Sequence, residues 1–288
     1  MSIAERPALA MDLLFSPRGI EAVQTTVPDA AVSALRWLTH LGDGALLAAV
    51  AVLFYWWDRD GRRRGASLLG IGLGGLALSV GLKGLFARPR PEGIAVIAEV
   101  GYSFPSAHAL GATVTWGALA VLLNVGTRRL RYALAGTVIV VVSLSRVVLG
   151  VHYPGDVLAG LGLGLVYLWI AFRFVGVKPA RLFALALGIA AVGAVVGGGY
   201  RAPIAVGGTV GAAIGWRMVG SVHVSPSSPS VTAVGIGGIS AGTATAMIAP
   251  VPTPSAVEAV GYGLLATAAV AAPLVAARLD DVLRKRRG

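Results

Sequence analysis

The sequence predicts an all-α fold, a polytopic bundle of transmembrane helices, and three observations lead to it. The chain of 288 residues is 56% hydrophobic but only 13% charged, whereas soluble domains carry about 25% charged residues. Its mean hydropathy is +0.79. Its 40 glycines suit helices that pack closely in lipid, where small side chains let backbones approach one another. We therefore expect a multi-pass protein of the cell membrane rather than a soluble domain.

The predicted helices are apolar stretches that approach the roughly 20 residues needed to cross a bilayer. They comprise residues 41–57, 65–86, 107–125, 131–150, 156–176, 181–199, 203–219, 231–249 and 256–277. The first and the seventh are short, and each carries an ionisable residue near one end, Asp43 and Arg217. Ahead of them, residues 16–40 are interrupted by prolines and charges. They predict one or two interfacial helices, with a segment that dips into the membrane as the alternative.

The basic residues predict the orientation. Most of the 24 Lys and Arg fall in every second loop of this topology and in the tail. Examples are Arg62–Arg64, Arg128–Arg131 and Arg284–Arg287. Because an excess of Lys and Arg marks cytoplasmic loops, we place these segments in the cytoplasm. The net charge of +11 then reflects membrane anchoring, and we expect no nucleic acid partner.

Two features that the sequence lacks exclude some kinds of chemistry and processing. The chain has no cysteine, which excludes disulfides, thiolate catalysis and cysteine-ligated metals. The N-terminus, Met1–Arg6, lacks a basic segment followed by an apolar run, so we expect no cleaved signal peptide.

Three polar segments reach the membrane face opposite the arginine-rich loops. The first runs from Lys83 to Pro91 at the end of the second span. The second, residues 104–108, precedes the third span, and the last, residues 145–156, lies between the fourth and fifth spans. Since all three end at the same face, we expect them to form one site.

The cations of these segments suggest a site for a tetrahedral anion. Lys83 and Arg90 are seven residues apart, so they share a face if the helix continues that far. With Arg146 they form a cationic cluster at membrane depth, where ionisable residues are functional candidates. The forked donors of the two arginine guanidiniums suit a phosphate group. Ser106 occupies a helix-capping position, and its hydroxyl and the first amides of the following helix would add donors.

Two histidines complete the site. His152 and Asp156 lie at positions i and i+4, so the carboxylate can orient the imidazole, which can then attack phosphorus and form a phosphohistidine. His108 is available as general acid toward the leaving alkoxide and then as base for water. The same His-x-x-x-Asp pattern occurs in metal sites, but no third ligand clusters with it. We therefore expect no metal and no cofactor.

Other ionisable residues receive plainer interpretations. His40 and His223 are expected to be structural residues or interface anchors, and Arg88 a second interfacial cation. Glu92 and Glu99 lie in the 87–106 loop, and a role for them at the substrate mouth is the less favoured interpretation.

The three segments resemble the signature of the type-2 phosphatidate phosphatase superfamily, which also contains bacterial acid phosphatases, glucose-6-phosphatase and vanadium haloperoxidases. That signature is Lys-x6-Arg-Pro, Pro-Ser-Gly-His and Ser-Arg-x5-His-x3-Asp. The matching residues are Lys83, Arg90, Pro91, Pro105, Ser106, His108, Ser145, Arg146, His152 and Asp156. Ala107 replaces the glycine, which would cost about 1 kcal/mol only if this position needs a positive φ.

The resemblance covers residues 35–176 and implies a helical bundle with metal-independent chemistry. It implies that His152 is the nucleophile, Asp156 its partner and His108 the acid. The phosphate-binding residues that it implies are Lys83, Arg90, Ser106, Arg146 and the backbone of Ala107.

On this basis the chain divides into three parts. Residues 1–40 form an N-terminal interfacial segment, residues 41–177 the phosphatase core with its catalytic motifs, and residues 178–288 further transmembrane helices with a basic cytoplasmic tail. We interpret the last part as a packing or oligomerisation module, which would allow a homo-oligomer. A lateral wall that shapes lipid entry is the alternative.

The expected function is hydrolysis of a lipid phosphate monoester or diphosphate, through a phosphohistidine, at the non-cytoplasmic membrane face. A phosphotransferase on the same core remains an alternative. A non-enzymatic transporter or receptor is a weaker one, because binding alone does not need His108 and the His152–Asp156 pair. A haloperoxidase is disfavoured because the known examples resemble soluble proteins. Phosphatidate, phosphatidylglycerophosphate and polyprenyl phosphates or diphosphates present the same terminal group, so the lipid stays open.

Overall fold

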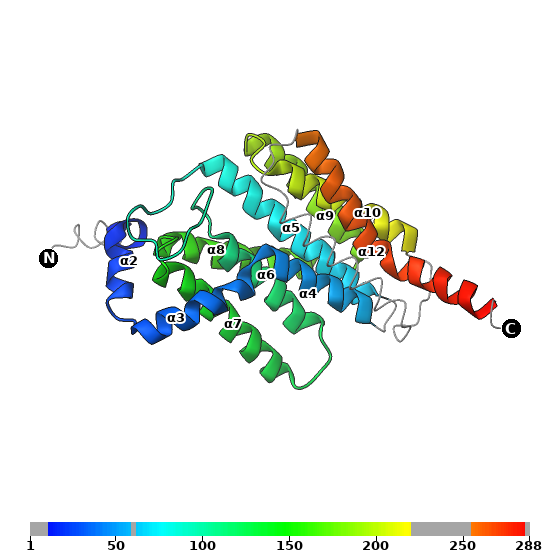
Figure 1. Cartoon of the computed structure of the whole chain (residues 1–288), viewed down its shortest axis with the longest axis horizontal. Coiled ribbons are helices and arrows are strands. Elements are labelled where there is room, and N and C mark those ends of the chain that lie inside the picture. The colour runs from blue at the N-terminus through cyan, green and yellow to red at the C-terminus, as the bar shows by residue number, and fades with distance from the viewer. Residues whose placement is uncertain (1–10, 59–61, 220–254, 286–288) are drawn as a thin grey trace.

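The computed structural model describes residues 11–58, 62–219 and 255–285, and the described residues form helices and contain no strand. The elements are α2 (Pro17–Gln24), α3 (Asp29–Leu38), the 3-10 helix η1 (Thr39–Gly42), α4 (Gly44–Trp57), α5 (Arg63–Phe86), α6 (Ala107–Leu122), α7 (Arg128–Val148), α8 (Pro154–Ile170), the π-helical turn η2 (Ala171–Val175), α9 (Pro179–Val196), α10 (Ala202–Val219) and α12 (Ser255–Lys285). The all-α prediction is confirmed; the longer helices run roughly along the long axis of an elongated bundle, and α2 stands across one end of it (Figure 1).

Five of the described helices are long and apolar enough to cross a membrane. They are α5, α7, α8 with its π-helical turn, α9 and the first part of α12, and they correspond to five predicted spans. The predicted span 107–125 is the shorter apolar helix α6, and the span 203–219 is the helix α10, which is not among the five. The predicted span 231–249 lies outside the described residues. The described residues thus hold fewer full spans than we predicted for them.

The predicted span 41–57 is the second half of a bent pair. Asp29–Gly42 and Gly44–Trp57 are apolar enough to form one span together, but they are bent by 51° at the break. If the pair is a single broken span, the described residues hold up to six spans. The segment 16–40 therefore forms two helices, as predicted, and the second of them leads directly into this bend. Its membrane-dipping alternative is compatible with the length and composition of the pair.

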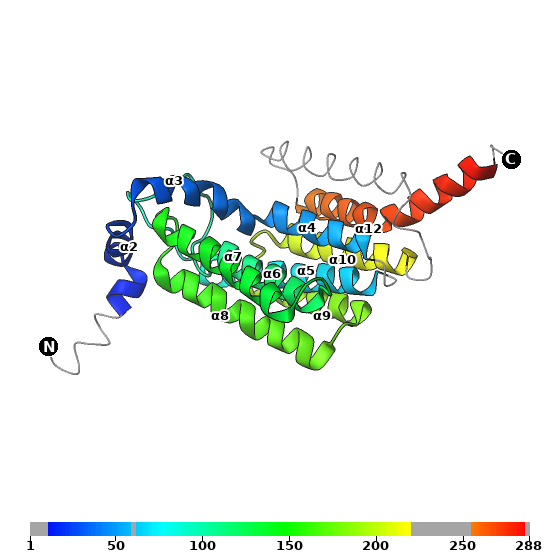
Figure 2. The same ribbon diagram turned by 90° about the horizontal axis from the view of Figure 1, so that it is seen from below.

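The chain folds so that its polar segments meet at one end of the bundle. The C-termini of α5 and α7 and the N-termini of α6 and α8 all lie at the end occupied by α2, whereas α5 and α7 begin at the other end (Figures 1 and 2). The long 87–106 connection between α5 and α6 lies at the same end as α2 (Figure 1). This arrangement is the convergence that the predicted topology required.

Helix α5 is the centre of the bundle, and 72% of its apolar window is buried. Its residues Leu68 and Ile71 are fully buried in the main core cluster with Leu110 and Val114 of α6. Since α5 also ends at the polar loop, packing of this helix fixes the position of the site relative to the rest of the bundle.

The C-terminal helices join this core through glycine contacts. A Cβ atom added at Gly81 of α5 would lie 2.7 Å from the Cα atom of Gly193 in α9, and one added at Gly84 would lie 2.1 Å from the carbonyl oxygen of Gly197. Helices α10 and α12 meet in the same way, with Gly211 against the backbone of Gly263. Small residues therefore bring the backbones of these helices into direct contact.

Helix α12 also reaches back to α4 through two hydrogen bonds. The Tyr55 hydroxyl donates to the carbonyl oxygen of Val270 at 3.0 Å, and the Trp56 indole donates to that of Ala269 at 2.8 Å. Both side chains are almost completely buried. The C-terminal helices thus pack onto α4 and α5, the first two helices of the predicted core.

Candidate active site

The centre of the site is a cluster of three side chains, His152, Ser103 and Asp156. The Ser103 hydroxyl lies 3.3 Å from His152 Nδ1 and donates a short hydrogen bond to Asp156 Oδ2. The direct separation of His152 Nδ1 and Asp156 Oδ2 is 3.6 Å, which exceeds a normal hydrogen bond. The structure thus brings the predicted pair together, but a serine hydroxyl links the two side chains. All three side chains are buried.

The other ring nitrogen of His152 faces a cation. Its Nε2 atom lies 3.1 Å from an Arg90 guanidinium nitrogen. Because a guanidinium can only donate, Nε2 acts as the acceptor and the proton of the neutral ring lies on Nδ1. Nδ1 then donates to the Ser103 hydroxyl, which in turn donates to Asp156. The hydrogen bonds therefore assign one tautomer to His152, with its lone pair directed to the cations.

The surroundings of His152 keep its imidazole neutral. Burial lowers the pKa of His152 well below its usual value of 6.5, and the positive charges of Arg90, Lys83, Arg146 and His108 lower it further. Desolvation and nearby like charge both disfavour the imidazolium form. At neutral pH the ring therefore keeps the free lone pair that a nucleophile needs.

Local backbone structure holds Asp156 in place. It is the third residue of α8, which begins at Pro154, and its carboxylate accepts from the Tyr153 amide at 3.1 Å. Its backbone carbonyl accepts from the Ser106 amide at 3.0 Å. The starts of α6 and α8 are thus hydrogen-bonded directly to each other.

Glycine in α8 makes this approach possible. A Cβ atom at Gly160 would lie 2.7 Å from the Ser106 carbonyl oxygen, closer than van der Waals contact allows. The glycine therefore lets α8 lie against the backbone that begins α6.

The predicted cap of α6 is confirmed, and the concern about Ala107 is removed. The Ser106 side chain accepts from the Ala109 amide at 3.4 Å. Ala107 is the first helical residue, and it is not among the residues with positive φ, so an L side chain is compatible with the backbone there. The amides of Ala107 and His108 occupy the first helical turn, where no intrahelical acceptor exists.

Lys83 and Arg90 both belong to the site, but not through a shared helical face. Helix α5 ends at Phe86, where Ala87 adopts a left-handed conformation with φ 43° and Pro89 and Pro91 follow. Lys83 is buried at the end of the helix and donates to the carbonyl oxygens of Tyr102 and, at 3.2 Å, Ser103.

Arg90 reaches the site from the loop. It donates at 2.9 Å to the Val151 carbonyl oxygen and at 3.0 Å to that of Gly101. The condition for a shared helical face is therefore not met, because α5 ends at Phe86, where the predicted span 65–86 also ends.

Arg146 is bound by a residue of the loop. Its side chain is 1% exposed and donates to Thr39 Oγ1 at 2.8 Å and to Glu99 Oε2 at 2.6 Å. The same Glu99 oxygen lies 3.7 Å from Arg90. A loop carboxylate thus bridges two of the three predicted phosphate-binding cations.

The side chain that orients His108, Asp43, lies outside the three sequence motifs. The Nε2 atom of His108 lies 2.7 Å from Asp43 Oδ1, and His40 Nδ1 lies 2.6 Å from Asp43 Oδ2. Asp43 stands at the bend between η1 and α4. The second predicted histidine is therefore oriented by a carboxylate, and His40 takes part in that contact as a structural partner.

Arg88 lies against the site as well. Its guanidinium stacks at 4.5 Å over the Phe15 ring and 4.8 Å over the Tyr153 ring, and one nitrogen lies 3.7 Å from Asp156 Oδ1. We predicted only an interfacial cation here. The structure instead places Arg88 beside the carboxylate that faces Ser103.

Sequence reasoning missed three contributors, namely Ser103, Asp43 and Thr39. Ser103 has no fixed spacing from His152, because the folding of the loop brings it there. Asp43 gave a usable signal, since an ionisable residue at the end of an apolar span is a functional candidate. His223 lies outside the described residues.

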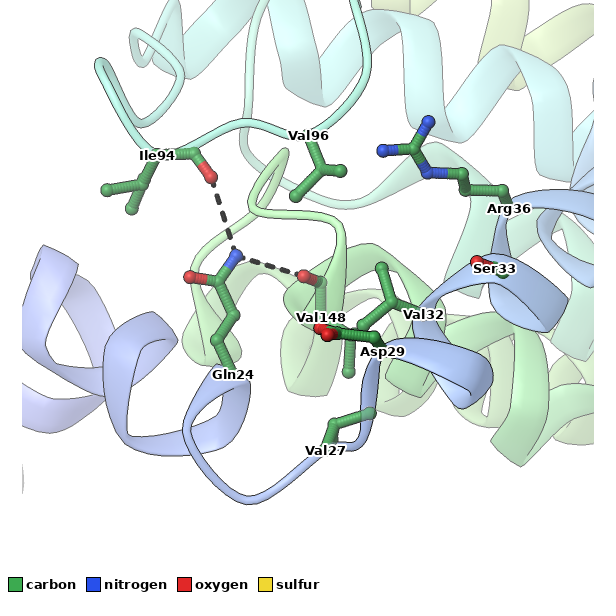
Figure 3. A pocket seen from close by; sticks show the side chains of 9 residues that line it. All are labelled: Gln24, Val27, Asp29, Val32, Ser33, Arg36, Ile94, Val96 and Val148. Carbon is green, nitrogen blue, oxygen red and sulfur yellow. Dashed lines mark hydrogen bonds between the residues drawn. The ribbon is translucent and has the colours of Figure 1, made fainter.

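A shallow pocket of about 390 Å³ lies beside the site (Figure 3). The pocket is bounded by α2, α3, the end of α7 and the loop segment that leads to Glu99. In its wall, the Gln24 side chain donates to the carbonyl oxygens of Val148 at 2.9 Å and of Ile94 at 3.4 Å (Figure 3). None of the predicted site residues lines this pocket. It therefore lies outside the candidate active site.

Fold and site together define a class of protein, a multi-pass membrane enzyme that acts on a phosphate group. The family model described as the PAP2 superfamily matches residues 64–180. Phosphatidylglycerophosphatase B of Bacillus subtilis is 33% identical over 149 residues, which cover 48% of this chain and 71% of that protein. Decaprenylphosphoryl-5-phosphoribose phosphatase of Mycobacterium tuberculosis is 34% identical over 169 residues, or 52% of this chain and 86% of that protein.

A solved structure agrees with these sequence relatives. It is the crystal structure of the first transmembrane PAP2 type phosphatidylglycerolphosphate phosphatase from Bacillus subtilis, with 26% identity and a TM-score of 0.53. The similarity covers 60% of this chain and 87% of that one. The chain belongs to the PAP2 superfamily. It is a PAP2-type membrane lipid phosphatase, a hydrolase of phosphoric esters.

Proposed function

We propose that this phosphatase hydrolyses a lipid phosphate monoester or diphosphate through a phosphohistidine on His152, without a metal, at the non-cytoplasmic face. The observation that carries the proposal is the orientation of His152. Its Nε2 lone pair points at Arg90, and its Nδ1 proton is directed through Ser103 to Asp156. A neutral imidazole with one nitrogen anchored and the other facing cations is arranged for attack on phosphorus.

In the first step, the substrate phosphate replaces Arg90 as the group in front of His152 Nε2. Lys83, Arg90 and Arg146 then stabilise the charge on the equatorial oxygens, as preorganised donors do in phosphoryl transfer. The amides of Ala107 and His108, with the Ser106 hydroxyl, add further donors. The N–P bond forms while the bond from phosphorus to the lipid oxygen breaks.

His108 supplies the proton for the departing oxygen. Its Nε2 atom contacts Asp43, which leaves Nδ1 as the ring nitrogen for proton transfer. After the lipid alcohol, or lipid phosphate in the case of a diphosphate, has left, neutral His108 accepts a proton from water. The water oxygen attacks phosphorus, the N–P bond breaks, and inorganic phosphate leaves. His152 returns as the neutral ring and His108 as the acid.

The names of the relatives suggest the substrate class. One relative is a phosphatidylglycerophosphatase, another acts on decaprenylphosphoryl-5-phosphoribose, and a third, from Sulfolobus acidocaldarius, is an undecaprenyl-diphosphatase. These names share an amphiphile that ends in a phosphate group. We propose the same class for this protein, with the tail undecided between glycerolipid and polyprenyl.

Phosphate release from purified protein in detergent tests the chemistry. The panel contains phosphatidate, phosphatidylglycerophosphate, a polyprenyl phosphate and a polyprenyl diphosphate, each with EDTA present. We expect release from at least one of these lipids, loss of release in His152→Ala, and an acid-labile phosphorylated protein that forms only in the wild type. Full activity of His152→Ala, or an absolute need for a divalent metal, contradicts the proposal. Formation of product only when an acceptor alcohol is added indicates a phosphotransferase instead.

The proposed orientation is supported by the positions of the arginines. Arg63 and Arg128 begin α5 and α7 at the bundle end away from α2 and the site (Figure 1), and cytoplasmic loops are rich in such residues. The chain has no cysteine, so single cysteines can report the sidedness. Val100 at the site end and Val125 at the other end are 77% and 76% exposed.

In intact cells, an impermeant maleimide should label Val100→Cys and should leave Val125→Cys unlabelled until the membrane is opened. The reverse pattern places the site in the cytoplasm. The activity of each variant in detergent serves as the control for correct folding.

A further inference from the structure

The Glu99 carboxylate occupies the cations that the proposed function assigns to substrate phosphate. One of its oxygens lies 2.6 Å from Arg146 and 3.7 Å from Arg90. Arg146 is 1% exposed, so its charge needs an anionic partner in the absence of ligand, because an unpaired buried charge is costly. Glu99 is the carboxylate that meets this need.

Binding of the substrate phosphate changes the charge around Arg146 and Arg90. A phosphate group brings a charge near −2 to the same guanidiniums, and a carboxylate held among them would repel it. Guanidinium forks bind carboxylates and phosphates with the same geometry, so both anions compete for the same donors. Glu99 must therefore give up at least part of its contact with Arg146 and Arg90 when phosphate enters.

The position of Glu99 permits such a displacement. Its side chain is 22% exposed, in contrast to Arg146, so the carboxylate has water on one side to receive it. It belongs to the 87–106 loop rather than to a helix. The adjoining segment is joined to the α7–α8 turn by the Val96 amide, which donates to the Leu149 carbonyl oxygen at 2.9 Å. The outward side of this segment borders the pocket of Figure 3, which Val96 lines.

We propose that Glu99 is a built-in competitor of the phosphate group. It neutralises Arg146 and Arg90 while the site is empty, yields them to the substrate, and returns to them to help expel inorganic phosphate. This inference rests on the proposed function of the same cations as a phosphate site. It assigns to Glu99 the task of limiting the affinity for the product, which carries the same charged group as the substrate.

The direction in which phosphate affinity changes in Glu99→Gln distinguishes competition with phosphate from a purely structural role of Glu99. If Glu99 competes with phosphate, Glu99→Gln keeps the shape of the side chain but removes its charge, and phosphate binds more tightly. If Glu99 only positions Arg146, the same substitution disorders the guanidinium and phosphate binds more weakly. We expect the dissociation constants of orthophosphate and vanadate to fall about tenfold in Glu99→Gln, the change that corresponds to one modest charge interaction.

The experiment uses the full chain in detergent and measures orthophosphate binding by calorimetry, which needs no turnover. Glu92→Gln is the matched control, since Glu92 is an exposed carboxylate of the same loop and its removal lowers the loop charge equally. We expect no change in this control. Glu99→Ala provides a second variant with the same expected direction, and thermal unfolding verifies that each variant is folded.

Turnover gives a second readout. In Glu99→Gln we expect a lower KM for the lipid together with a lower kcat, because tighter product binding slows release. Unchanged or weaker orthophosphate binding in both Glu99 variants overturns the role of Glu99 but leaves the phosphatase chemistry intact. Wild-type protein that binds neither orthophosphate nor vanadate overturns the phosphate site itself, and with it both proposals.

Discussion

His152 Nε2 lies 3.1 Å from the Arg90 guanidinium, and a phosphate group that approaches Nε2 must break this contact. Arg90 meanwhile donates to three backbone carbonyl groups of the loop and of the α7–α8 turn. It is therefore anchored when the substrate arrives. The guanidinium can shift its remaining donor from nitrogen to phosphate oxygen without losing its position.

Ser103 is expected to support catalysis through His152. Ser103→Ala removes the hydroxyl that joins His152 to Asp156, and loss of such a supporting group typically costs 10- to 100-fold, about the size of effect that we expect in kcat. Ser103→Thr, which keeps the hydroxyl, should recover much of the activity. The imidazole ¹⁵N shifts of His152 should show a mixture of tautomers in Ser103→Ala and a single tautomer in the wild type. Equal kcat in all three proteins contradicts this role.

Asp43 is expected to act through His108. Asp43→Asn keeps an oxygen near His108 Nε2 but removes the charge that stabilises the protonated ring, so kcat for a lipid phosphate should fall by about 100-fold, within the range for general acid catalysis. With an aryl phosphate, whose leaving group needs little protonation, the defect of the first step should be much smaller. His40→Asn should have a weaker effect, because His40 is more exposed than His108 and contacts Asp43 rather than His108. An equal loss with both substrates indicates a structural role for Asp43.

The pH dependence of His152 follows from its lowered pKa. Because the neutral ring is the nucleophile, activity persists as the pH falls until His152 becomes protonated, and this occurs below its usual value of 6.5. The ¹⁵N shifts of the ring, assigned by their loss in His152→Gln, should therefore remain those of a neutral imidazole at pH 6. The unfolded chain takes up this proton more readily than the folded chain, so this residue should lower stability as the pH falls through 6.5. Titration of the folded ring at or above 6.5 contradicts this expectation.

Gly160→Ala should separate the starts of α6 and α8. The added Cβ atom would meet the Ser106 carbonyl oxygen at 2.7 Å, and overpacking of this kind typically costs about 1–3 kcal/mol. We expect a lower midpoint of thermal unfolding in detergent and reduced activity, since Ser106 and Asp156 are hydrogen-bonded across this contact. Gly162→Ala is the matched control, because a Cβ atom there meets no atom within 4 Å. Similar effects of the two substitutions contradict the proposed contact.

The sequence alone was sufficient for the helical class and for the convergence of the three motifs. Long apolar stretches predict helices such as α5 and α7, and the basic residues of alternate loops predict which helix ends lie at the same face. The cap at Ser106 and the helix start at Pro154 follow from local backbone chemistry, which depends on neighbouring residues only. These features were predictable because each of them is encoded within a few turns of chain.

The remaining contacts depend on how the loop and the first helices fold back onto the site. Ser103 reaches His152 across 49 positions of sequence, and Thr39 reaches Arg146 across 107. No periodicity or spacing encodes such distances. The spans were also over-predicted, because apolar composition does not reveal the bend at Asp43 or the shortness of α6.

The contact between α5 and α9 has a mechanical consequence for Lys83. Gly81 and Gly84 lie on either side of Lys83 in the sequence and contact the backbone at the end of α9. Helix α9 begins at Pro179, and the family match ends at residue 180. Because Gly81 and Gly84 are three residues apart, they lie on the same face of α5, and α5 cannot rotate about its axis without bringing bulkier side chains against this backbone. Helix α9 therefore fixes the rotation of α5 about its axis, so a helix that lies almost entirely beyond the family match helps to set the direction in which Lys83 points.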